Sequence, residues 1–174
     1  MHIFPPLARH SHTLLTNEPK QVADLDDDSF QEVIVATEKG SIYSFHVTGR
    51  NFTKRTIVEG LTEDSGVELA FASIEALDID ADGDTDIIAS SFSELYLIEN
   101  NGFQNFRPKV VANQNDTGFV GGAGVAAYDL NGDGRTDILA AAKTAGEVFW
   151  LESFLMPSFS PTPAPTHSPS PIPA

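Results

Sequence analysis

The chain has 174 residues and a formal net charge of −15, with a sequence pI of about 4.4. This acidity argues against nucleic acid as a partner, because binding to phosphates needs a basic surface. The absence of cysteine excludes disulfide bonds, zinc–thiolate sites and a cysteine nucleophile. No apolar run approaches the ~20 residues of a membrane-spanning helix.

Residues 1–11 are expected to be irregular, because Pro5-Pro6 disfavours regular structure. This stretch also lacks the roughly 7–15-residue apolar core of a signal peptide. The sequence therefore predicts either a cytosolic protein or a start that differs from the native one. The first expected strand is His12–Thr16, which resembles the later segments 55–58 and 109–111 and reads as the last strand of an incomplete unit.

Three acidic loops begin at Asp24, Asp78 and Asp129. In the clearest loop, 78–86, acidic side chains fill every second position and Gly83 is sixth. Carboxylates at positions 1, 3 and 5 converge only if the backbone curls, and a sixth-position glycine permits that turn. Converging carboxylates repel one another unless a cation lies between them. Ca²⁺ suits such a loop because it takes roughly 6–8 oxygen ligands at about 2.3–2.6 Å. The alternative is a solvated acidic turn, but the recurrence of the spacing favours a cation loop.

The EF-hand is the nearest competing motif, and it requires a glutamate at position 12 between two helices. Position 12 is Val35, Ala89 or Ala140 in the three loops. Each loop is followed by a short apolar run, at 33–36, 87–89 and 138–140, and these runs are typical of buried strands. The EF-hand and the similar dockerin interpretations therefore fail.

The loops recur after 54 and 51 residues, and the aromatic residues Tyr43, Tyr96 and Phe149 recur after 53 and 53. A period near 50 indicates a repeat array such as a propeller. In the second unit we expect strands at 73–77, 86–90, 94–99 and 108–112. Turns between strands are expected at Gly40 in the first unit, at Asn101-Gly102 in the second and at Ala145-Gly146 in the third. Units of four strands are the blades of propellers.

These loops, the strand after each, and the motifs at 95–100 and 148–153 together resemble the FG-GAP (VCBS, integrin-α-type) repeat. The resemblance covers about residues 12–153 and implies an all-β fold of about three four-stranded β-propeller blades with calcium loops. It also implies Ca²⁺ ligands at positions 1, 3, 5 and 9, with the position 7 carbonyl as a further ligand. The expected metal residues are Asp24, Asp26, Asp28, Phe30 and Glu32; Asp78, Asp80, Asp82, Asp84 and Asp86; and Asp129, Asn131, Asp133, Arg135 and Asp137.

The first loop is expected to bind metal most weakly, because Ser29 replaces the sixth-position glycine where the turn favours a positive φ. The glycine-rich segment 118–124 resembles the family's Phe-Gly/Gly-Ala-Pro signature, and we expect it to give tight entry to an inner strand. A phosphate-binding loop is disfavoured there, because no Lys-Ser/Thr follows.

Sequons at Asn51 and Asn115 are expected in turns and weakly indicate a glycoprotein. Scattered histidines, His46 included, are expected to serve packing or the surface.

We expect residues 1–11 to be irregular, blades at about 12–66, 67–117 and 118–155, and a disordered Pro/Ser/Thr-rich tail or linker at 156–174. The expected function is a Ca²⁺-binding extracellular or cell-surface interaction module for adhesion, or for binding matrix protein or polysaccharide. No catalytic residues are expected, since metal ligation accounts for the acids. Alternatives are a non-catalytic propeller part of a larger carbohydrate-active enzyme, and a gene fragment without independent function. Self-association or additional blades are expected to cover the apolar ends of an open arc.

Overall fold

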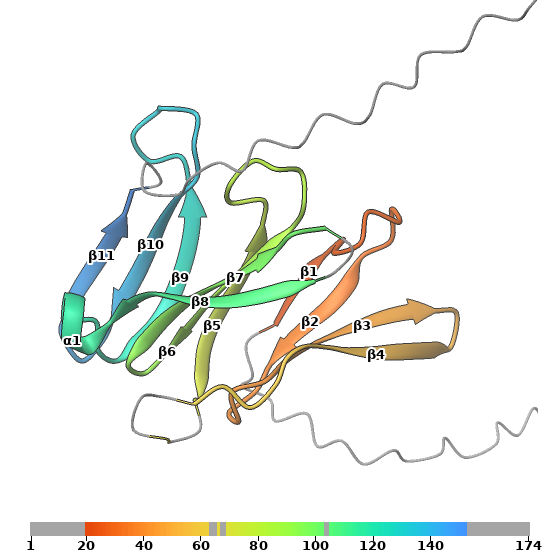
Figure 1. Cartoon of the computed structure of the whole chain (residues 1–174), viewed down its shortest axis with the longest axis horizontal. Helices are drawn as coiled ribbons and strands as arrows, with labels where there is room; N and C mark the ends of the chain where they lie inside the picture. Colours follow the sequence, from red (N-terminus) through yellow and green to blue (C-terminus); the bar gives the residue numbers. More distant parts are fainter. Residues whose placement is uncertain (1–19, 63–65, 67–68, 103–104, 153–174) are drawn as a thin grey trace, which may run out of the picture.

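The computed structural model describes residues 20–62, 66, 69–102 and 105–152, and in these residues the chain is all-β. Figure 1 shows three antiparallel sheets in a row. The first sheet contains β1 (Lys20–Ala23), β2 (Glu32–Ala36), β3 (Ile42–Thr48) and β4 (Asn51–Val58). The second contains β5 (Phe71–Leu77), β6 (Asp86–Ser91), β7 (Glu94–Asn100) and β8 (Phe106–Asn113). The third contains β9 (Gly122–Tyr128), β10 (Asp137–Ala142) and β11 (Glu147–Leu151).

Within each sheet the strands follow one another in chain order, so every sheet is an antiparallel meander. The first strands of neighbouring sheets contact each other, β1 with β5 and β5 with β9. This arrangement confirms the expected all-β fold of blade-like sheets, and all four strands predicted for the second unit form within two residues of their predicted bounds. The strand expected at His12–Thr16 lies outside the described residues.

Two apolar cores lie between the sheets. The first inter-sheet core joins the first and second sheets, and it includes Ile34 and Ile42 on one side and Ile87 and Ile98 on the other. The second inter-sheet core joins the second and third sheets, and it includes Ile88, Leu95, Leu97, Ile138 and Phe149. Strand β6 contributes alternate residues to the two cores, because successive side chains of a strand point to opposite faces. All six of its residues are therefore buried.

The glycine-rich segment leads into β9 as expected. Gly121 has φ +76°, and a Cβ there would overlap Thr144. A Cβ on Gly122 would overlap the carbonyl oxygen of Ser91. Only glycine fits at these two positions, because the chain passes close to the turn between β10 and β11 at Gly121 and close to the second sheet at Gly122.

Two local expectations differ from the structure. The sequon at Asn115 lies in a single-turn helix, α1 (Gln114–Thr117), rather than in an open turn, because Asn113 caps it by accepting from the Asp116 N–H. Asn51 opens strand β4 one residue after the turn. Both asparagines are exposed. Among the described residues, no helix has the length and apolarity to cross a bilayer.

Candidate metal centre

The three acidic loops share one pattern of hydrogen bonds, in which carboxylates accept from loop backbone N–H groups. The position 2 N–H donates to the position 9 carboxylate, in the pairs Leu25–Glu32 (3.0 Å), Ile79–Asp86 (3.1 Å) and Leu130–Asp137 (3.1 Å). The position 6 N–H donates to position 1, in Ser29–Asp24, Gly83–Asp78 and Gly134–Asp129. The position 7 N–H donates to position 5, in Phe30–Asp28, Asp84–Asp82 and Arg135–Asp133. The sequence repeat is therefore also a repeat of loop geometry.

Carboxylates from positions 1, 3 and 9 converge in two of the loops. One ligand atom from each of Asp78, Asp80 and Asp86 lies within 4.8 Å of the others, and the same holds for Asp24, Asp26 and Glu32. The position 5 carboxylates, Asp82 and Asp28, lie outside these two trios. In the third loop Asn131 takes position 3, and its amide nitrogen donates to Asp133 (3.3 Å) and Glu152 (2.8 Å).

Asp86 is almost fully enclosed, with 1% of its surface exposed. Its Oδ2 accepts from the Ile79 N–H, and its Oδ1 accepts from the Asn100 N–H at 2.8 Å. Burial raises the pKa of Asp86 to about 7, against the opposing effect of these two hydrogen bonds. Burial also raises the pKa values of Asp80 and Asp84, with the Asp82 charge adding to each. The second loop thus concentrates carboxylates that are costly to ionise without a cation.

One buried atom in this loop lacks a partner. The Oδ1 of Asp78 is inaccessible to solvent and forms no hydrogen bond. A buried carboxylate oxygen left unsatisfied is costly, and a hard cation bound by oxygen ligands satisfies it. The donor set of Asp78, Asp80 and Asp86 therefore fits Ca²⁺. When bound, the ion would neutralise the carboxylates and connect the turn after β5 to the start of β6.

The first loop departs from this pattern at position 9. Glu32 is longer than Asp86 by one methylene, and its Oε1 lies 2.8 Å from Nδ1 of His46 on β3. The Asp28 Oδ2 lies 3.9 Å from the same nitrogen. The hydrogen bond to Glu32 raises the pKa of His46, and Asp28 adds to this effect. His46, expected only to pack or face solvent, therefore belongs to the loop cluster.

The loops also differ in backbone conformation. Ser29 has φ +71°, which confirms that position 6 of the first loop requires a left-handed residue. Position 4 is left-handed as well, with Asp27 at +56° and Ala81 at +61°, while the third loop has Gly132 there. Left-handed backbone costs a non-glycine residue roughly 1–2 kcal/mol. Backbone strain thus falls from the first loop to the third. The sequence pattern did not predict the positive φ at position 4.

Asn100 connects the first and second loops. Its side-chain Nδ2 donates to the carbonyl oxygens of Leu25 and Thr85, both at 3.2 Å. Its backbone N–H holds Asp86. The sequence gives one signal for this role, a polar residue at the end of the apolar strand β7 directly before the Asn101-Gly102 turn.

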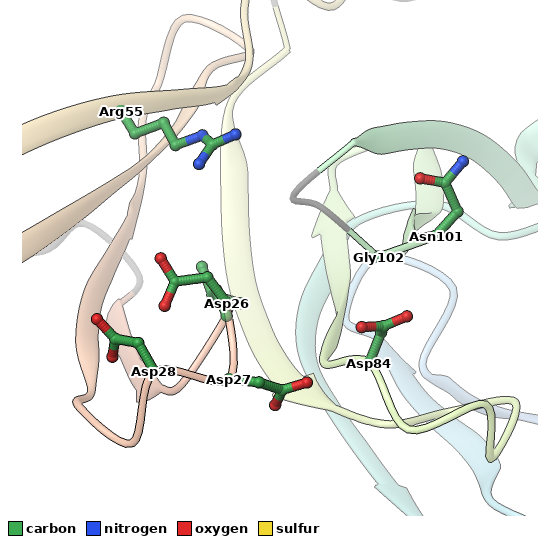
Figure 2. Close-up of a pocket in the computed structure, with 8 residues that line it drawn as sticks. Asp26, Asp27, Asp28, Arg55, Asp84, Asn101 and Gly102 are labelled. Carbon is green, nitrogen blue, oxygen red and sulfur yellow. The ribbon is translucent and has the colours of Figure 1, made fainter. Parts of the chain in front are cut away.

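A cleft of about 640 Å³ separates these two loops. Figure 2 shows Asp26, Asp27 and Asp28 on one side and Asp84, Asn101 and Gly102 on the other, with Arg55 reaching in from β4. The Asp27 charge contributes to the raised pKa of Asp84, so the two loops repel each other across the cleft. Cation binding within the loops would reduce this repulsion.

A sequence model of the protein family described as FG-GAP-like repeat matches residues 78–140. The chain contains an FG-GAP-like repeat. The match runs from the first acid of the second loop through β6, β7, β8 and β9 into β10, so it includes both the second and the third loops. Curated protein sequences give no match. The first sheet and the first loop lie outside the matched residues.

Proposed function

We propose that this FG-GAP-like repeat protein is a Ca²⁺-stabilised interaction module that acts outside the cell, with no catalytic role. Two observations support it together: the carboxylates of Asp78, Asp80 and Asp86 converge, and one oxygen of Asp78 is buried without a partner. Each bound ion would join two strands of one sheet at the end where the loops lie. The partner proposed is an extracellular protein or polysaccharide, which the rigid row of sheets would engage.

Thermal unfolding in excess Ca²⁺ and in EGTA tests the metal part of this proposal. Binding to the native state adds about 2.7 kcal/mol per site at 100 times the Kd. For a chain of this size that corresponds to a rise in Tm of roughly 5–10 °C per occupied site. Mg²⁺ should substitute poorly, because it demands stricter octahedral geometry. Equal midpoints in Ca²⁺ and EGTA would refute Ca²⁺ stabilisation.

The interaction part is tested separately, by binding of the intact chain to arrays of matrix proteins and polysaccharides in Ca²⁺ and in EGTA. The proposal expects at least one ligand whose binding is saturable and lost in EGTA. Stabilisation by Ca²⁺ without binding to any member of either class would support the metal site and refute the interaction role.

A further inference from the structure

Each outer sheet of the row in Figure 1 has one face turned away from the middle sheet, and this face carries exposed apolar side chains. The first open face lies on the first sheet, turned away from the second sheet, and consists of Val22, Val33, Tyr43, Phe45 and Phe52. The second open face lies on the third sheet, again turned away from the second, and consists of Tyr128, Leu139, Val148 and Trp150 on its strands. We include Leu130, which lies in the loop directly after β9 and is exposed. Six of these ten side chains are among the large hydrophobic residues that the structure leaves exposed, namely Val22, Phe52, Tyr128, Leu130, Val148 and Trp150.

Each residue of the second open face has a counterpart one repeat earlier that is packed between sheets. These counterparts are Leu77, Ile79, Ile88, Leu95 and Leu97, all in or against the second inter-sheet core. The strand register supports the match, since Trp150 pairs with Leu139 as Leu97 pairs with Ile88. Trp150 is 54% exposed where Leu97 is 4% exposed, and Val148 is 65% exposed where Leu95 is 0% exposed. The second open face thus has the composition of an inter-sheet contact that lacks its other half.

The first open face is the matching half. Its residues correspond, one repeat later, to Ala76, Ile87, Tyr96, Ile98 and Phe106, which pack in or against the first inter-sheet core. Register again agrees, because Phe45 pairs with Val33 as Ile98 pairs with Ile87. Between neighbouring sheets of the chain, the equivalent of the first open face packs on the equivalent of the second open face, which the preceding sheet supplies.

Charge also favours contact between the two open faces. Lys20 pairs with Val35, and Lys54 pairs with Phe45, so both lysines share the first open face. The second open face is bordered by the exposed acid Glu152, two residues after Trp150. Contact between two first open faces would bring the two lysines of one copy against those of the other. Head-to-tail contact, of a first open face with a second open face, places the lysines near the acid.

We propose that a second copy of this chain covers both faces. The first open face of each copy packs on the second open face of the other, and the two identical contacts close a ring of six sheets. Six blades lie within the range of roughly 4–8 for propellers, and closure removes the exposed sheet faces. Two head-to-tail contacts related by a two-fold axis form a closed dimer. This dimer does not depend on the proposed metal binding or ligand.

Light scattering after size-exclusion chromatography tests this assembly with three matched variants. Phe52→Glu alters the first open face, Trp150→Glu alters the second, and Phe92→Glu alters a turn between β6 and β7 that belongs to neither. These side chains are 61%, 54% and 54% exposed, so each change replaces a comparable exposed aromatic with an acid. Circular dichroism checks that all three variants retain their strands.

The expected mass of the wild type and of Phe92→Glu is about twice the 18.7 kDa of one chain. Phe52→Glu and Trp150→Glu alone should each be monomeric, because neither preparation contains an intact pair of faces. Their equimolar mixture should regain a weaker dimer, because one of its two contacts carries neither change while the other carries both. A monomeric wild type, a dimer unaffected by either change, one variant that still dimerises alone, or assemblies that keep growing would each overturn the closed six-sheet ring. A monomeric wild type would assign the faces to other partners or further blades.

Discussion

The substitution Asp86→Asn separates the cost of burying a charge from the benefit of binding a cation. The asparagine side chain has nearly the same shape, so packing is retained. One of its two terminal atoms becomes an amide nitrogen, while both carboxylate oxygens of Asp86 accept backbone N–H groups, from Ile79 and Asn100. The variant therefore loses a charge and leaves one buried N–H without an acceptor.

The two effects have opposite signs. Without metal the pKa of Asp86 is about 7. That value is about three units above the ordinary one, so keeping the charge at about pH 8.5 costs the folded state on the order of 4 kcal/mol. The lost acceptor costs about 1–3 kcal/mol. We expect metal-free Asp86→Asn to be about 1–3 kcal/mol more stable than the wild type.

In excess Ca²⁺ the order should reverse, because the wild type gains the binding free energy and the variant lacks a charged ligand. Urea unfolding at about pH 8.5, in EGTA and in excess Ca²⁺, measures both differences. Asp116→Asn is the control, an exposed acid outside the loops, and it should change stability by less than about 0.5 kcal/mol in either buffer. A variant that is less stable than the wild type in EGTA, or equally stabilised by Ca²⁺, would refute the reasoning.

Three further predictions follow from the loops. In EGTA the free energy of unfolding should fall as pH rises from about 4 to about 8. The reason is the raised folded-state pKa, chiefly that of Asp86, because the folded chain then binds more protons than the unfolded chain in this pH range. Asp86→Asn should flatten this slope in urea titrations, and an unchanged slope would contradict the assignment. Ser29→Gly should stabilise the chain by about 1 kcal/mol by relieving left-handed strain, and a lower Tm in calorimetry would count against it. Asn100→Ala should cost about 1–3 kcal/mol, since the buried carbonyl group of Leu25 and the half-buried one of Thr85 lose their donor. Asn101→Ala serves as the neighbouring control and should cost clearly less.

The repeat itself could be predicted from the sequence. Spacing near 50 residues, apolar runs after each acidic loop and recurrent aromatics are local patterns, and they predicted the strands of the second sheet within two residues. The left-handed turn at Ser29 followed from the same comparison. The second and third loops have glycine at position 6, which implies a positive φ at the same position of the first loop. These features depend on residues close together in the chain, where propensity and periodicity are informative.

The tertiary structure decided what depends on distance between segments. The link from Asn100 to Leu25 spans 75 residues, and no local pattern specifies it. The pairing of Glu32 with His46 depends on the register between β2 and β3 and on one extra methylene. The raised pKa of Asp86 arises from its burial in the folded chain, which the alternating acids of the loop do not specify. Leu97 in the middle sheet is buried, whereas the equivalent Trp150 in an outer sheet is exposed, since burial is a property of neighbours rather than of the residues themselves.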